Sequence, residues 1–442
     1  MTSQQDIPLY EEVVNGFDHW ADHMSHNETS DLRKTRRLAF EKFRESGFPS
    51  IKSEDWKYTN ITRFLKDEYR LESSIAPAVL SPALLESAVI PDFDCYTIVL
   101  VNGVWEKKLG SALPTGVSLL PVAEAKADPA LSAWFERPAD GKDRYFTALN
   151  TALFSDGLFL RVKAGARPDK PLHIIHAFTS GYNLMVQPRH VWVLDRNAEL
   201  SVIESVIAAA GDARIWVNSF TEISLQTDAK LDHALIQATT AGIRLVNHTT
   251  VRQKKGSLYN NYTFTLPGAD LVRNDLQARL EEDHTETHLY GLYLAAGQQL
   301  IDNHTLVDHQ KPSCFSNELY KGVLLEQSTG VFNGKVFVHQ DAQKTNAFQQ
   351  NNNLVIGKKA TIDSKPELEI YADDVKCSHG TTVGQFSEDA LFYLRARGVG
   401  KDTARALLIN AFAFDVTEKI KWPAVESHIN RLISHHIPVT HA

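Results

Sequence analysis

The sequence has 442 residues, of which 43% are hydrophobic and 23% charged, and its formal net charge at pH 7 is -8. This acidic balance argues against a nucleic-acid surface, and no apolar run approaches the roughly 18 uncharged residues that a membrane helix needs. Three cysteines, Cys95, Cys314 and Cys377, are too few and too scattered for a disulfide framework. We therefore expect a soluble, cytoplasmic protein without a signal or transit segment, and without nucleic-acid or membrane partners.

Residues 8–47 have the periodicity of two amphipathic helices whose apolar stripes need a surface to cover. Asp31 is the expected N-cap of the second helix, and Gly47 followed by Pro49 is the expected stop. The segment from Ser53 carries Trp56 among charged residues, and we interpret it as an aromatic anchor that holds the helices on the body. The apolar positions of the two stripes are Leu9, Val13, Phe17, Trp20, Leu32, Leu38, Phe40 and Phe43.

From about Pro77 short strands alternate with helical pieces, one of them predicted at 143–154, and we group residues 1–150 as an N-terminal helical and mixed domain. From Arg189 to Gly384 β-rich runs recur with almost no helical periodicity, in the later part every 13 to 17 residues or so. Asn333-Gly334 is the one hairpin-type dipeptide in this stretch. The pattern predicts a parallel β-solenoid core over 151–385, with Gln349 to Asn353 as an amide ladder at a corner.

Helical periodicity returns after Gly384 and predicts a C-terminal helical domain over 386–442. Ser387 is a helix start, Gly398 a helix end, and Pro423 the start of the last helix. The segment from Leu407 to Phe414 carries more apolar residues than one stripe can hold, which indicates burial on several sides or a partner.

Cys377 and His379 are the residues of most chemical interest. On a strand they share one face, because side chains alternate, and a thiolate beside an imidazole is typical of metal, sulfur or redox sites. A small buried cysteine beside a hydrogen-bonded histidine is the simpler reading of the two residues alone.

Other patterns favour structural roles. No P-loop or dinucleotide-binding motif is found, so we expect no ATP site in this chain. His284, Glu286 and His288 alternate, but they are expected to face solvent while the threonines between them turn inward. His304 and His309 are expected on opposite faces, Cys314 at a strand start and Cys95 in a core strand.

Longer motifs resemble the SufB/SufD family of iron-sulfur cluster scaffold proteins over essentially the whole chain. They include YADDVKCSHGTTVGQFSEDALFYLRARG from Tyr371, DNHTLVDHQKPSCFSNELYKGVL from Asp302 and SEDWKYTNI from Ser53. The reading SHGTTVGQF is similar to the SufD branch, since SufB proteins carry a sequence of the HEATTSKI kind there. The resemblance implies a mainly β fold with helical ends, a right-handed parallel β-helix flanked by helical domains.

The resemblance also implies a scaffold subunit, not an enzyme, that works with SufB and the ATPase SufC. His379 would contribute a metal ligand to a nascent iron-sulfur cluster at the interface with SufB, with Cys377 as a supporting residue. The C-terminal helices would dock SufC, which alone would bind ATP, and no cofactor would be held tightly by this chain. The docking residues expected on these helices are Leu391, Tyr393, Arg395, Leu407, Phe412 and Phe414.

Alternatives stay open. The chain could be a purely structural subunit that stabilises SufB and recruits SufC without touching the cluster, and a solenoid enzyme such as a polysaccharide lyase is a distant third reading. An exposed solenoid edge would let the isolated chain pair with a copy of itself. The sequence does not decide whether Cys377 or Cys314 takes part in cluster chemistry, whether a flavin associates, or which movement ATP drives.

Overall fold

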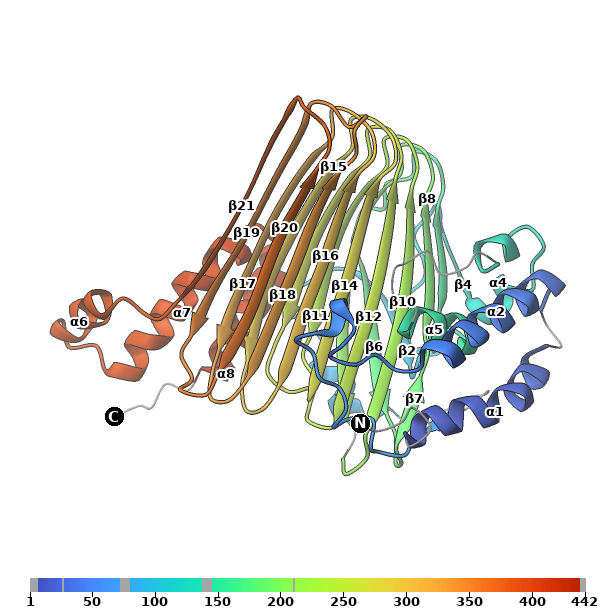
Figure 1. Cartoon of the computed structure of the whole chain (residues 1–442), viewed down its shortest axis with the longest axis horizontal. Coiled ribbons are helices and arrows are strands. Elements are labelled where there is room, and N and C mark those ends of the chain that lie inside the picture. The colour runs from blue at the N-terminus through green and yellow to red at the C-terminus, as the bar shows by residue number, and fades with distance from the viewer. Residues whose placement is uncertain (1–6, 26–27, 72–79, 137–144, 210, 438–442) are drawn as a thin grey trace.

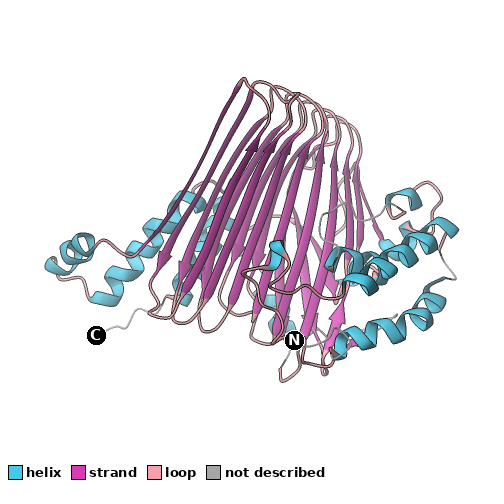
Figure 2. Ribbon diagram, in the orientation of Figure 1, coloured by secondary structure: helices cyan, strands magenta, loops and turns pink. Residues whose placement is uncertain are grey.

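Two long parallel sheets face each other in a computed structural model that describes residues 7–25, 28–71, 80–136, 145–209 and 211–437 (Figures 1 and 2). In these residues one sheet has 11 strands and the other 10, and from Arg189 onward successive strands enter the two sheets in turn. The chain therefore winds as a β-solenoid with helices at both ends, which confirms the predicted fold. Its right-handedness stays a prediction.

The strands of the solenoid are mostly eight to eleven residues long. The 11-stranded sheet contains β1 (Arg70–Leu71), β4 (Val117–Pro121), β5 (Leu158–Val162), β7 (Leu184–Val186), β8 (Arg189–Leu194), β10 (Ile215–Leu225), β12 (Ile243–Gln253), β14 (Leu271–Leu280), β16 (Leu300–His309), β18 (Thr329–Val338) and β20 (Thr361–Ile370). The 10-stranded sheet contains β2 (Tyr96–Val101), β3 (Val104–Trp105), β6 (Leu172–Thr179), β9 (Glu199–Ala209), β11 (Lys230–Gln237), β13 (Leu258–Thr265), β15 (Glu286–Ala295), β17 (Phe315–Leu324), β19 (Thr345–Val355) and β21 (Val375–Gly384).

Each coil contributes one strand to each sheet, so two of the β-rich runs seen in the sequence make one coil. Coil length varies. Leu258 pairs with Glu286, 28 residues on, whereas Phe315 pairs with Asn346, 31 residues on. Gly256 and the non-glycine residues Asp228, His284, Ser313 and Lys344, which turn the corners before successive strands of the 10-stranded sheet, all have positive φ.

Alternation places every second side chain of a strand in the interior between the sheets. In β16, Thr305, Val307 and His309 are buried, while His304 and Asp308 are only partly covered. The predicted opposite faces of His304 and His309 are therefore confirmed. The Gln349–Asn353 run lies within β19 and not at a corner, which corrects the prediction, because its buried amides bond to interior groups.

The N-terminal elements lie at one end of the solenoid and over the outer face of the 11-stranded sheet (Figure 1). They comprise α1 (Pro8–Met24), α2 (Ser30–Ser46), η3 (Glu54–Trp56), α3 (Pro82–Ser87), η4 (Lys107–Leu109), α4 (Val122–Ala125), η5 (Ser132–Trp134) and α5 (Phe146–Leu153). The first two residues of the helix predicted at 143–154 lie outside the described residues. Thr29, not Asp31, caps α2, because its side chain accepts a hydrogen bond from Leu32 N. Leu38 is 61% exposed and does not belong to the buried stripe.

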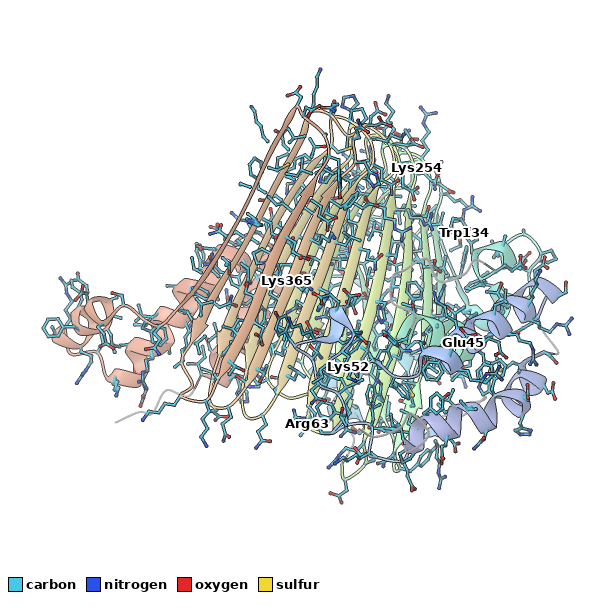
Figure 3. All side chains as sticks on the ribbon, viewed as in Figure 1. Glu45, Lys52, Arg63, Trp134, Lys254 and Lys365 are labelled. Carbon is cyan, nitrogen blue, oxygen red and sulfur yellow. The ribbon has the colours of Figure 1, made fainter. Side chains whose placement is uncertain are left out.

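Trp56 confirms the predicted aromatic anchor. Its indole is 1% exposed and stacks under the Arg273 guanidinium at 3.8 Å, while Arg273 donates to the Asp55 carbonyl at 2.9 Å. Beside it, Lys365 of β20 forms an ion pair of 2.9 Å with Glu54, and Figure 3 shows Lys365 on the sheet near this segment. The N-terminal segment is thus fixed to the outer face of the 11-stranded sheet.

The C-terminal helices α6 (Glu388–Ala396), α7 (Lys401–Thr417) and α8 (Pro423–His436) follow β21 directly. Ser387 caps α6 by accepting from Ala390 N, as predicted. Lys321 of β17 binds Asp415 and donates to the Phe412 carbonyl at 2.9 Å, which fixes α7 to the 10-stranded sheet. The helical unit therefore extends from the end of the solenoid that carries Cys377 and His379 (Figure 1).

Candidate functional site

The candidate site lies on the last coil of the solenoid. β20 pairs with β18 and β21 pairs with β19, and each of these two last strands is the end of its sheet within the described residues. Both therefore present an unpaired backbone edge at the same end of the molecule (Figure 1). Ile370, Tyr371 and Val383, at this end, are 38%, 60% and 56% exposed.

The register of β21 places Cys377 and His379 on the interior face of this coil. Cys377 pairs with Ala347 and His379 with Gln349, both of which are buried. Because side chains alternate along a strand, the predicted common face of Cys377 and His379 is confirmed. With no further coil above them, they lie at the open end of the interior.

Cys377 and His379 differ in accessibility. Cys377 is half-buried and packs in an apolar cluster with Val336, Val338 and Ala347. Burial raises the pKa of its thiol, which lowers the share of the thiolate that binds metals. His379 is exposed, and its ring has no hydrogen-bond partner among the described residues. The imidazole is the more accessible ligand.

Beneath His379 lies a buried polar pair that sequence reasoning missed. Gln349 Nε2 donates to Glu318 Oε2 at 2.8 Å, and the two residues are 3% and 2% exposed. Glu318 pairs with Gln349 just as Gln349 pairs with His379, so the three positions form one column across successive coils. Burial raises the pKa of Glu318 to about 7, although the hydrogen bond from Gln349 partly offsets this.

Other polar side chains in the interior at this end are linked by hydrogen bonds. Ser364 Oγ lies 2.9 Å from Thr381 Oγ1 and donates to Asn351 Oδ1 at 2.8 Å. Asn353 donates to the same Asn351 oxygen at 2.6 Å, and Tyr293 donates its hydroxyl to Asn353 at 2.6 Å. A hydrogen-bonded network thus continues from the exposed last strand into the buried interior.

The other candidate ligands do not assemble into a metal site. His284 lies in a corner, and His288 Nε2 is 2.6 Å from Glu286 Oε1, whereas the inward-facing Thr285 and Thr287 are buried as expected. Within the described ranges no group of three or more His, Cys, Asp or Glu side chains is arranged to hold a metal ion. The cluster of His176, Glu204 and His233 is buried, with both histidine Nε2 atoms 2.6 Å from the carboxylate.

The remaining cysteines lie away from the open end. Cys314 immediately precedes β17, as expected, and is 1% exposed; it accepts a hydrogen bond from Thr285 Oγ1 at 3.0 Å. Burial raises the pKa of its thiol. Cys95 precedes β2 and is partly exposed, which corrects its expected place in a core strand. Neither residue lies on the last coil with His379.

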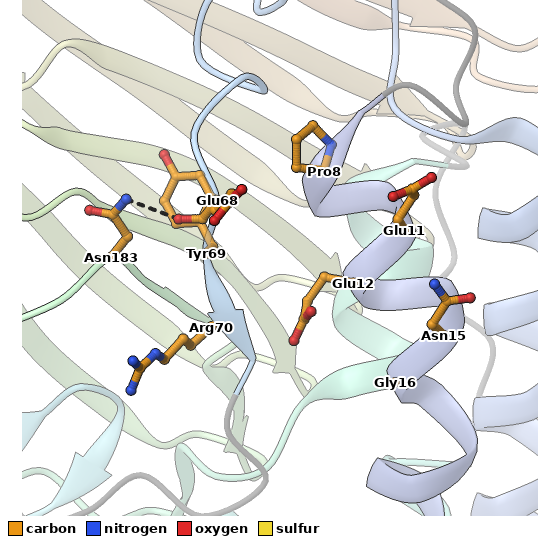
Figure 4. A pocket seen from close by; sticks show the side chains of 9 residues that line it. All are labelled: Pro8, Glu11, Glu12, Asn15, Gly16, Glu68, Tyr69, Arg70 and Asn183. Carbon is orange, nitrogen blue, oxygen red and sulfur yellow. Dashed lines mark hydrogen bonds between the residues drawn. The ribbon is translucent and has the colours of Figure 1, made fainter.

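Two surface cavities have no cysteine among the residues that line them. One of about 720 Å³ lies between α1 and the β1 segment, lined by Glu11, Glu12, Glu68 and Arg70 among others (Figure 4). Another of about 450 Å³ surrounds the Trp56 anchor. Its lysines are already paired, Lys335 with Glu369 and Lys365 with Glu54. Both lie beside the N-terminal segment, and the second extends to β20 through Lys365, Glu367 and Glu369.

The predicted docking residues on the C-terminal helices fall into two groups. Tyr393, Leu407 and Phe414 are 54%, 48% and 52% exposed, and Arg395 is exposed as well. Leu391 is buried and Phe412 half-buried, so these two pack within the free chain. Phe392, which sequence reasoning left out, is 73% exposed.

Most of the chain is similar to known proteins of one family. Residues 176–412 match the family described as SUF system FeS cluster assembly, SufBD core domain, and residues 9–174 match the SufBD protein N-terminal region. The chain is 30% identical over 423 residues to the iron-sulfur cluster assembly SufBD family protein slr0076 of Synechocystis, covering 93% of this chain and 92% of that protein. It is 30% identical over 399 residues to the iron-sulfur cluster assembly protein SufD of Escherichia coli, covering 89% and 90%.

A plant protein is also similar over a shorter span. The chloroplastic protein ABCI7 of Arabidopsis thaliana is 31% identical over 283 residues, which cover 62% of this chain and 59% of that protein. In the described part of the chain, no helix is long and apolar enough to span a membrane.

Proposed function

The chain belongs to the SufBD family of iron-sulfur cluster assembly proteins, and from this premise we propose that it is a scaffold subunit whose His379 binds the nascent cluster at an interface with SufB. The observation that carries the proposal is the exposed imidazole of His379 on the interior face of the last coil. There no further coil of this chain covers it.

The chemistry of the open end suits a shared site. A neutral imidazole and thiolates are good ligands for iron. The cluster, built from iron and sulfide, is the cargo of a scaffold and must be released again. This chain supplies the imidazole, whereas its own Cys377 is half-buried with a raised thiol pKa. The thiolate ligand would therefore come mainly from the SufB partner, with Cys377 in a supporting role.

The two unpaired edges support a partner at the same end. β20 and β21 leave backbone donors and acceptors open beside exposed Tyr371 and Val383, and such an edge pairs readily with another chain. We propose that SufB covers this end in the complex, and that a second copy of this chain covers it when SufB is absent. A self-pairing of this kind would be isologous.

The C-terminal helices would recruit the ATPase SufC. Exposed Tyr393, Leu407 and Phe414 lie on helices fixed to the solenoid through Lys321, so a movement of SufC would be transmitted to the coils beneath. ATP would bind only to SufC, and this chain would act as a cytoplasmic scaffold without a tightly held cofactor or a reaction of its own.

The test uses the complete complex with SufB and SufC after anaerobic reconstitution with iron and sulfide. His379→Ala should abolish cluster accumulation, measured as bound iron and sulfide, while the complex still elutes intact in gel filtration. Cys377→Ser should retain most of the cluster. Normal cluster content in the His379→Ala complex would instead favour a purely structural subunit that stabilises SufB and recruits SufC.

A further inference from the structure

Gln349 lies directly beneath His379 in the solenoid. The two residues are paired in register on adjacent parallel strands, and both belong to the interior face. Gln349 is 3% exposed, so it forms the buried floor directly beneath the exposed imidazole. Neighbouring positions in register on parallel strands lie about 5 Å apart, within reach of two long side chains.

The amide of Gln349 has a fixed orientation. Its Nε2 donates to Glu318 Oε2 at 2.8 Å, and at pH 8, above the Glu318 pKa of about 7, the ionised carboxylate can only accept, so the NH2 group faces Glu318. The carbonyl oxygen Oε1 then points away from Glu318. This oxygen is buried and has no hydrogen-bond partner among the described side chains, which is costly for a polar atom.

The Gln349 amide is tightly packed. A Cβ atom added at Gly334 of β18 would lie 2.5 Å from Gln349 Nε2 and 2.6 Å from the Phe332 ring. A side chain at position 334 would therefore displace the amide. Glycine at this position leaves room for Gln349 to lie against Glu318.

We propose that Gln349 is a positioning residue for His379, and that its Oε1, which has no partner in this structure, accepts a hydrogen bond from one ring nitrogen when the imidazole turns toward it. A neutral imidazole carries a proton on one nitrogen and a lone pair on the other. Holding the N–H toward Gln349 leaves the other nitrogen free to face iron at the open end. Glu318 fixes the amide from behind. The inference rests on the proposed role of His379.

The first experiment detects the hydrogen bond itself in the free full-length chain. Long-range proton–nitrogen NMR on histidine-labelled protein at one fixed pH of 8 reports which ring nitrogen of His379 carries the proton, and the signal is assigned by its loss in His379→Gln. One tautomer should dominate in the wild type. Gln349→Met should return the ring to a mixture of tautomers. Gln350→Met, next in sequence but exposed on the outer face, should not change it.

A double variant tests whether the effect of Gln349→Met comes from a loss of folding. Exchanging the pair, Glu318→Gln with Gln349→Glu, keeps their volumes and their mutual hydrogen bond and places a carboxylate acceptor beneath His379. This variant should restore the single tautomer seen in the wild type. The proposal is wrong if Gln349→Met keeps the single wild-type tautomer, or if the exchanged pair shows the same mixture of tautomers as Gln349→Met.

The second experiment follows the cluster in the assembled complex. Gln349→Met should weaken iron retention against a chelator by about 10 to 100-fold, the usual effect of losing a group that orients a ligand, and the exchanged pair should recover it. Normal retention in Gln349→Met together with loss in His379→Ala would overturn this inference alone. Normal retention in His379→Ala would overturn the proposed function, whatever the tautomer measurement shows.

Discussion

Glu318 accepts a hydrogen bond of 2.8 Å from Gln349 in the solenoid interior, and this buried carboxyl group has a pKa raised to about 7. Burial is the main cause, because a charged carboxylate is poorly solvated there. At neutral pH both protonation states of this carboxyl group are therefore populated. Glu318 lies one coil below Gln349, the residue beneath His379.

The first prediction concerns stability against pH. An acid whose pKa rises from 4.5 to about 7 on folding binds a proton between these pH values only in the folded chain. Stability therefore falls as the pH rises through this window and stays lower above it. Glu318→Gln should raise the free energy of unfolding over wild type by about 3 kcal/mol at pH 8 and have little effect at pH 5.

Urea unfolding at the two pH values measures this difference. The buried histidines titrate equally in both proteins, so their contribution cancels in the comparison. Glu45→Gln, which alters an exposed carboxylate on α2 (Figure 3), should cause no pH-dependent difference. An equal effect of Glu318→Gln at pH 5 and pH 8 would contradict the raised pKa.

The second prediction concerns SufC. Leu407 and Phe414 are about half exposed on α7, whereas Ile409 between them is 2% exposed. Replacing Leu407 and Phe414 together with serine should weaken SufC binding about tenfold or more, since exposed apolar anchors carry much of an interface's affinity. Titration calorimetry measures the affinity.

Ile409→Ala provides the contrast for this pair. It should lower the melting temperature by creating a cavity, whereas the double serine variant should melt like wild type. Unchanged SufC affinity in the folded double variant would mean that SufC docks elsewhere.

The third prediction concerns the N-terminal anchor. Trp56→Ala should remove a buried indole and the stacking partner of Arg273, at a cost of about 3 to 5 kcal/mol. Limited proteolysis should then cut within residues 50–65 faster than in wild type. Tyr58→Ala, in the same segment but 38% exposed, should be cut at the wild-type rate. Equal protection of the Trp56→Ala chain would show that other contacts hold the segment.

Local patterns were enough to predict the faces of the last strand. Alternation placed Cys377 and His379 on one face of β21. In the same way, the odd separation of His304 and His309 placed them on opposite faces of β16. The contribution of Glu318 and Gln349 could not be found in this way, because it depends on register between coils. Coil length varies from 27 residues at Arg244, which pairs with Leu271, to 32 at Thr329, which pairs with Thr361, so counting along the sequence does not align them.

The amide-rich run shows a second limit of sequence reasoning. Asparagine and glutamine usually indicate corners, but Asn351 and Asn353 lie inside β19, where they bond to each other and to interior hydroxyls. Their buried setting follows from partners on other coils. Leu38 is the converse case, since an apolar residue next to a buried stripe is left exposed on α2.

The last prediction tests the packing around the Gln349 amide with a substitution in the opposite sheet. Gly334→Ala would place a methyl group 2.5 Å from Gln349 Nε2, so the amide or the neighbouring Phe332 ring must move. We expect a loss of about 1 to 3 kcal/mol in stability and, in the complex, a lower cluster content than wild type. Gly384→Ala on β21 is the matched control, because its added methyl group meets no atom within 4 Å. Wild-type cluster content in a measurably destabilised Gly334→Ala complex would show that the position of the Gln349 amide does not matter to the cargo.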